Sequence, residues 1–228
     1  MAQSTDKIEV YLEIGKQRTF AAALDWPGWC RSGRDEASAL QALLDYEPRY
    51  ARVLRGARLG FHAPANATVA IVERIAGNAS TDFGVPGLAL SGDAQPVDAA
   101  ELARLQKLLK ACWRAFDAAR EAAAGAELRK GPRGGGRDVN GIARHVFEAE
   151  AAYLGQIGIK FKPDRAADLG EEQERARQAI LDGIAASARG ELPARGPRGG
   201  LRWTPRYATR RIAWHVLDHA WEIEDRAP

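Results

Sequence analysis

The last predicted helix, residues 207–225, carries two histidines, His215 and His219, four positions apart. Residues four apart on an α-helix lie on one face, about one turn from each other, so both imidazoles can bind one metal ion. Both flank the apolar stripe that contains Ile212 and Val216. We therefore expect the two histidines at the edge of a helix–helix interface.

A third histidine occurs in a repeat of the same segment. Residues 142–148, Ile-Ala-Arg-His-Val-Phe-Glu, match residues 212–218, Ile-Ala-Trp-His-Val-Leu-Asp, in residue type at every position except the third. His145 therefore takes the same edge of its own helix. The repeat predicts two helical hairpins of similar plan, whose packing brings the three histidines together.

A histidine pair with this spacing is also typical of half-buried polar residues at a helix edge, without any metal. The chain has four histidines, and three of them occupy equivalent edges of two predicted helices. The fourth, His62, belongs to a predicted loop elsewhere. This distribution favours a metal site over two unrelated polar residues.

Residues 96–226 resemble the DinB-like, or YfiT-like, superfamily of metal-binding four-helix proteins. That family has one histidine on the second helix and His-x-x-x-His on the last, which here are His145, His215 and His219. The resemblance implies an up-up-down-down bundle that binds a divalent ion, commonly zinc or nickel. Some members are S-transferases or isomerases that use mycothiol or bacillithiol, so it also implies a low-molecular-weight thiol as a cofactor.

Three neutral imidazoles leave a further coordination position on the ion, as in reactive rather than purely structural zinc sites. Glu148 and Asp218 each follow a histidine by three residues and are candidate catalytic acids or bases. Their helical angles also suit surface acids, because they point further from the core than the histidines do. Tyr153 and Trp214 are candidates to line the site or to pack in the core.

The composition sets wider limits. With 228 residues and 46% hydrophobic content, the chain can bury one large core or two modest ones. No run of about 18 apolar residues and no charged-then-apolar leader before Lys7 occurs, so we expect a cytoplasmic protein without a membrane span. Cys30 and Cys112 lack metal or redox spacing and are expected as free thiols, with Cys112 in the packing face of its helix.

The N-terminal half has the pattern of a small α+β domain. Strands are predicted from the period-two alternation of residues 7–14 and from residues 18–24 and 68–73, and the order allows a further strand after Pro27-Gly28. Residues 34–54 have the apolar spacing of a helix, although Pro48 should kink or break it.

This order is similar to the HicB-like antitoxin domain, β-β-(β)-α-β. The similarity is carried by Thr19-Phe-Ala-Ala-Ala, by Asp25-Trp-Pro-Gly-Trp-Cys30 and by Ser38-Ala-Leu40. In the antitoxins this fold covers a toxin and is joined to a DNA-binding segment, which we do not find here. An alternative is a cap or dimerisation module.

Residues 76–97 have the glycine and proline content of a linker, so we expect domains at 1–92 and 93–228. Further helices are predicted at residues 98–123, capped by Asp98, and at residues 171–189. The expected fold class is thus α+β, with a HicB-like domain followed by a DinB-like four-helix bundle.

Three functions remain open. The one we favour is a divalent-metal-dependent enzyme acting on a small molecule, either a thiol-dependent S-transferase or a hydrolase. The alternative is a non-enzymatic module with a structural metal, whose HicB-like domain makes protein contacts or joins a homodimer. The third is nucleic-acid binding by the Gly-Pro-Arg-Gly-Gly loops at 131–135 and 196–200. The absence of aromatic residues in both loops argues against it.

Overall fold

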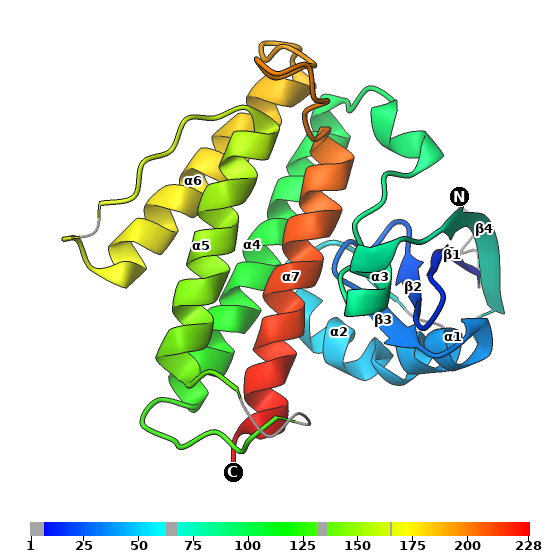
Figure 1. The fold of residues 1–228 in the computed structure, drawn as a ribbon, viewed down its shortest axis with the longest axis vertical. Coiled ribbons are helices and arrows are strands. Elements are labelled where there is room, and N and C mark those ends of the chain that lie inside the picture. The colour runs from blue at the N-terminus through cyan, green and yellow to red at the C-terminus, as the bar shows by residue number, and fades with distance from the viewer. Residues whose placement is uncertain (1–6, 63–67, 132–135, 165) are drawn as a thin grey trace. The chain divides into compact units, whose positions relative to one another are not determined.

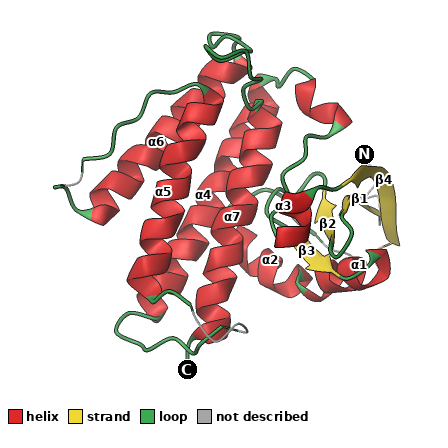
Figure 2. Cartoon of the chain, in the orientation of Figure 1, coloured by secondary structure: helices red, strands yellow, loops and turns green. Residues whose placement is uncertain are grey.

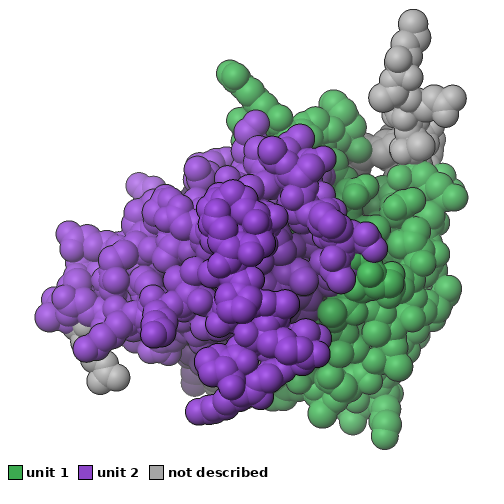
Figure 3. Space-filling view, turned by 90° about the horizontal axis from the view of Figure 1, so that it is seen from above, with its two compact units in different colours: residues 1–92 green, residues 93–228 purple. Residues whose placement is uncertain are grey.

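The computed structural model describes residues 7–62, 68–131, 136–164 and 166–228. The chain divides into two compact units, residues 1–92 and 93–228, which Figure 3 colours separately. The fold is α+β, as predicted: a four-stranded sheet belongs to the first unit, and long helices make up the second.

The sheet of the first unit contains β1 (Lys7–Ile14), β2 (Thr19–Ala23), β3 (Cys30–Gly33) and β4 (Thr68–Ala76), in the order β3-β2-β1-β4 (Figure 2). The β1–β2 and β2–β3 pairs are antiparallel, whereas β1 and β4 are parallel. A parallel pair needs a crossover, and the helices between β3 and β4 provide it. All four predicted strands are confirmed, including the one after Pro27-Gly28.

The single helix expected at residues 34–54 is instead two helices, α1 (Glu36–Asp45) and α2 (Glu47–Leu54). Tyr46 is both the C-cap of α1 and the N-cap of α2. Pro48 lies in the first turn of α2, where a backbone amide has no partner within the helix to lose. The proline therefore ends one helix and begins the next.

The prediction of a linker at residues 76–97 is wrong for much of that segment. It contains α3 (Ala79–Phe83), capped by the side chain of Asn78, and the 3-10 helix η1 (Ser91–Ala94). Asparagine, serine and glycine are common at helix caps and in turns as well as in linkers. The composition of this segment therefore reflects its caps and turns.

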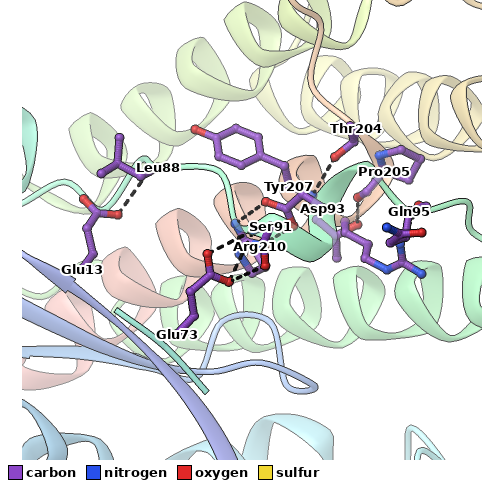
Figure 4. Close-up of polar contacts among 12 residues, drawn as sticks. Glu13, Glu73, Leu88, Ser91, Asp93, Gln95, Thr204, Pro205, Tyr207 and Arg210 are labelled. Atoms are coloured by element: carbon purple, nitrogen blue, oxygen red, sulfur yellow. Dashed lines mark hydrogen bonds and ion pairs between the residues drawn. The ribbon is translucent and has the colours of Figure 1, made fainter. Parts of the chain in front are cut away.

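Glu13 of β1 fixes this segment within the first unit. Its carboxylate is buried and accepts hydrogen bonds from the Thr81 hydroxyl (2.5 Å) and from the amides of Gly87 (3.0 Å) and Leu88 (3.1 Å). Figure 4 shows Glu13 facing Leu88. A buried carboxylate is tolerated where several donors surround it, so the sheet and the segment after it are ordered together.

The second unit consists of four long helices, α4 (Ala99–Ala122), α5 (Val139–Ile157), α6 (Leu169–Ala188) and α7 (Pro205–Arg226) (Figure 1). Each begins at a residue whose side chain accepts a backbone hydrogen bond from the first turn: Asp98, Asp138, Asp168 and Thr204. The predicted cap Asp98 is confirmed, and Pro205 lies in the first turn of α7, where a proline is favoured.

The expected up-up-down-down order of these helices is wrong. Arg206 of α7 bonds Glu101 of α4, so two helix starts meet and α4 runs parallel to α7. The amide of Trp203, just before α7, donates to the carbonyl of Gln156 near the end of α5, so α5 and α7 are antiparallel. Gln173 near the start of α6 bonds the carbonyl of Ala143 near the start of α5, which makes those two helices parallel.

The connections explain this order. Because α5 and α6 are parallel, the chain between them must return along the length of α5: 11 extended residues can reach about 36 Å, enough to pass its roughly 28 Å. The connection before α5 stays at one end, because the Arg129 amide donates to the Arg226 carbonyl at the end of α7. An up-up-down-down bundle needs two long crossovers, and this bundle has one.

The core of the bundle is apolar and continuous. Its fully buried members recur at three and four residues along each helix and include Leu105, Leu109, Cys112, Phe116, Ile142, Val146, Leu154, Ile180, Ile184, Ile212, Val216 and Ile223. Cys112 is a packing residue, as predicted, and burial raises the pKa of its thiol. Both cysteines are free and buried.

A buried ion pair ties η1 to α7. Arg210 donates to both carboxylate oxygens of Asp93, one of them at 2.8 Å, and both side chains are less than a tenth exposed (Figure 4). Loss of one partner alone would leave an uncompensated buried charge, which typically costs about 3–5 kcal/mol.

Glu150 of α5 is another buried acid of this unit, and it is fully buried. The Trp113 indole donates to its Oε1 atom at 2.6 Å, and Oε2 has no partner among the described residues. Burial raises its pKa to about 7, against the lowering effect of Arg177, while Asp117 and Glu174 raise it further. The folded protein therefore binds this proton more tightly than the unfolded chain does.

We predict that Glu150→Gln removes a pH-dependent loss of stability. Below pH 4.5 the carboxyl is neutral in both states; as pH rises to about 7, the unfolded chain loses the proton first, so the free energy of unfolding falls. A shift of this size corresponds to on the order of 3 kcal/mol. Denaturant unfolding of wild type and Glu150→Gln at several pH values from 4.5 to 8 measures it.

The matched control is Glu148→Gln, which changes an exposed acid on the same helix. Its stability should follow the wild-type pH profile. Parallel profiles for wild type and Glu150→Gln would contradict the role given to Glu150.

Candidate metal centre

The structure brings together the three histidines that the sequence singled out. His145 comes from α5, and His215 and His219 come from adjacent turns of α7. The Nε2 atoms of His145 and His215 lie 3.3 Å apart, and one nitrogen from each of the three rings lies within 4.8 Å of the others. The antiparallel packing of α5 and α7 places the single histidine opposite the pair.

These distances suit one divalent ion. Two nitrogens bound at about 2.0–2.1 Å to a tetrahedral ion lie about 3.3 Å from each other. The two Nε2 atoms of His145 and His215 already have this separation. The three ring centres are 4.7 to 5.2 Å apart and the ring planes are steeply inclined, so the imidazoles converge instead of stacking. Closure of the third nitrogen onto an ion needs a small side-chain movement.

Glu222 fixes the orientation of one ligand. Its Oε2 atom accepts a hydrogen bond from Nδ1 of His219 at 2.7 Å, which leaves the Nε2 lone pair of His219 free for a metal. Oε1 accepts from Arg226 at 2.6 Å, and Arg226 also donates to the carbonyls of Arg129 and Arg137. The bond from His219 is the main reason that the pKa of Glu222 is lowered, so the carboxylate stays ionised.

Two of the histidines are held neutral. Burial lowers the pKa of His145 and, more strongly, that of His215; neighbouring positive charges, led by His219 in both cases, add to the effect. Neutral imidazoles offer the lone pair that a metal requires. Nδ1 of His215 is buried and has no hydrogen-bond partner among the described residues, so ring packing must fix this side chain. The ring centres of Tyr153 and Trp214 lie 5.9 and 6.0 Å from the ring centre of His215.

The two acids proposed from the sequence take other places. Glu148 is exposed and lines a separate cavity of about 380 Å³ between α5, the 158–168 connection and α6. Asp218 is half-buried on α7. The acid that the structure does place on a histidine, Glu222, follows His219 by three residues, which is the same offset that suggested Glu148 and Asp218. Applied to all three histidines, that spacing would have included it.

The Gly-Pro-Arg-Gly-Gly loops at 131–135 and 196–200 are the segments considered for nucleic-acid binding. Residues 132–135 of the first lie outside the described residues. The second forms a closed turn, in which the Gly196 amide donates to the Gly200 carbonyl at 2.8 Å and Arg195 donates to the Gly199 carbonyl at 2.7 Å. It is therefore not the extended segment that follows a phosphate backbone, and nucleic-acid binding stays a hypothesis.

Among the described residues, no helix combines the length and the apolar character needed to cross a membrane. Comparison of the chain with protein-family models, with curated proteins and with solved structures gave no match. Inference about function therefore depends on the site itself.

We predict that Glu222→Gln weakens metal binding by about 10–100-fold, the usual effect of losing a carboxylate that orients a histidine ligand. The amide can still contact Nδ1 of His219 but no longer attracts its proton. Zinc affinity measured by competition with a chelator of known affinity tests this. Glu148→Gln serves as the matched control and should bind zinc like the wild type; equal affinities of Glu222→Gln and wild type would refute the assigned role.

Proposed function

We propose that this protein binds a divalent metal ion through His145, His215 and His219 and uses it in a reaction on a small molecule. The observation that carries the proposal is the convergence of three imidazole nitrogens within 4.8 Å on two packed helices. Apolar packing alone does not account for it, because three polar rings that meet at a helix interface lose hydration without gaining full hydrogen bonding. A shared ion would compensate all three.

The donor set favours a reactive ion over a structural one. Three imidazoles leave a coordination position open, whereas structural zinc sites have four protein ligands. His145 and His219 are partly exposed and His215 is buried, so the cluster lies at the edge of the core. Imidazole suits zinc and nickel alike. When bound, such an ion polarises a ligand or lowers the pKa of a coordinated water or thiol.

The chain's own residues would prepare this centre. Glu222 holds the proton on Nδ1 of His219 and so directs Nε2 towards the ion. Burial raises the pKa of the Tyr153 phenol, which therefore stays protonated and is a hydrogen-bond donor near neutral pH. Its ring and that of Trp214 hold His215 from two sides.

Within this proposal the reaction is thiol-dependent S-transfer or hydrolysis, with a low-molecular-weight thiol as cosubstrate in the first case. The support comes from the DinB-like placement of one histidine on the second long helix, α5, and two on the last, α7. We also carry the HicB-like resemblance of about residues 7–56, within the domain at 1–92, as part of the proposal, because the strands and helices of this domain follow the expected order apart from the divided helix. Binding of protein partners by that unit remains an alternative role.

Elemental analysis of purified wild type, His215→Ala and His62→Ala tests the proposal. We predict about one zinc or nickel ion per chain in wild type and in His62→Ala, and a large loss in His215→Ala, because two imidazoles bind much more weakly than three. His62 is the matched control because it is the one histidine outside the cluster and is exposed.

Metal removal from the wild type separates the two roles of an ion. A small change in Tm on chelation, together with loss of thiol-transfer or hydrolytic activity, is the expected result for a reactive centre. Unfolding on chelation would instead favour a structural metal. Absence of metal from the wild type, even after reconstitution with zinc and nickel, would refute the proposal.

A further inference from the structure

Arg211 lies one helical turn before His215 on α7 and shares its face. The side chain is half-buried, and its Nη1 atom is buried with no hydrogen-bond partner among the described residues. Two neighbouring arginines of α7 are paired: Arg206 with Glu101, and Arg210 with Asp93. Arg211 differs from both, because its interactions with described side chains are with aromatic rings.

Aromatic rings support the guanidinium from two directions. The carbon atom at its centre lies 4.6 Å from the ring centre of Trp214 and 5.5 Å from that of Tyr153. Rings attract a cation and fix its position, but they do not accept hydrogen bonds in the plane of the guanidinium. The buried Nη1 group is therefore left without a hydrogen-bond acceptor among the described residues.

A carboxylate is the acceptor that fits this arrangement. A guanidinium offers two parallel N–H donors, which match the two oxygens of a carboxylate in a charge-assisted bidentate pair. A buried donor without an acceptor costs free energy, so a ligand that supplies an acceptor gains binding free energy there. The positive charge also reaches His215, where it contributes to the lowered pKa of that ring, which places Arg211 within electrostatic range of the three-histidine cluster.

An apolar surface continues from Arg211 away from the histidines. Tyr153 lies 4.9 Å from Trp203, and Trp203 lies 5.0 Å from Tyr207, measured between ring centres. All three rings are half-buried, so each keeps an accessible portion. The Trp203 amide donates to the Gln156 carbonyl at 3.0 Å, which anchors this loop residue to the end of α5. A small aromatic or aliphatic body can pack here.

We propose that Arg211 binds the carboxylate of a small substrate or thiol cosubstrate whose reacting end lies at the three-histidine cluster. Four residues of helix correspond to about 6 Å along the axis, so the ligand needs a separation of a few bonds between its carboxylate and its reacting atom. The role of this carboxylate site in a reaction rests on the proposed metal centre. The site itself is made by Arg211 and the rings around it, and it is testable without metal.

The first test measures phenylacetate binding by calorimetry to wild type, Arg211→Gln, Arg211→Lys and Arg144→Gln, each metal-free and zinc-loaded. Arg144→Gln is the matched control, since it removes an exposed arginine beside His145. We expect Arg211→Gln to weaken binding by about tenfold or more in both forms, Arg211→Lys to weaken it less, and Arg144→Gln to equal wild type. Zinc content should be the same in all four proteins, because Arg211 is not a ligand.

The second test locates the carboxylate. In the cobalt-loaded protein, the absorption of a cobalt–thiolate bond reports binding of 3-mercaptopropionate, which has a carboxylate, and of 2-mercaptoethanol, which has none. If the thiol carries the carboxylate, Arg211→Gln weakens the binding of 3-mercaptopropionate by about tenfold and leaves the binding of 2-mercaptoethanol unchanged. If Arg211→Gln weakens the binding of phenylacetate but not the binding of either thiol, the carboxylate belongs to the other substrate, and the proposal still holds.

Two results would overturn the inference: phenylacetate binding that is equal in wild type and Arg211→Gln, or no phenylacetate binding to the wild type in either form. Failure of the chain to bind zinc or cobalt would refute the metal centre alone, because the metal-free calorimetry would still decide the role of Arg211.

Discussion

The antiparallel packing of α5 against α7 is the constraint on which the candidate site depends. It sets His145 opposite the turn of α7 that carries His215 and His219, with 3.3 Å between two facing nitrogens. A displacement of one helical turn, about 5.4 Å, would separate them. The register is held at both ends of α7, by the bond from Trp203 to Gln156 and by the bonds of Arg226 to the loop before α5.

Most buried polar groups near the site have hydrogen-bond partners among the described residues. Glu222 is held by Arg226 and in turn holds His219. Arg211 and the unpartnered Nδ1 of His215 are the exceptions, and both adjoin the three-histidine cluster. Unsatisfied buried polar atoms are costly and uncommon in folded proteins, so each of them calls for an explanation. Their position here supports a centre that is completed by an ion and a ligand.

Local pattern predicted the elements of this fold well, because strand alternation, helix periodicity and capping side chains are encoded over a few residues. The internal repeat also identified all three histidines that meet. Helix direction was missed, since apolar stripes define which face is buried and not which way a helix runs. Glu222 has the same three-residue offset from a histidine as Glu148 and Asp218, so spacing alone does not rank the three acids; its contact with His219 distinguishes it. The unpaired donor of Arg211 could not be predicted, because it depends on which side chains surround the guanidinium in the folded protein.

X-ray absorption spectroscopy of the zinc-loaded protein tests the central claim most directly. The account predicts three imidazole nitrogens at about 2.0–2.1 Å and at least one further light atom from solvent, and loss of this signature in His215→Ala. A first coordination sphere that contains sulfur, or one made only of oxygen atoms and unchanged in His215→Ala, would contradict it.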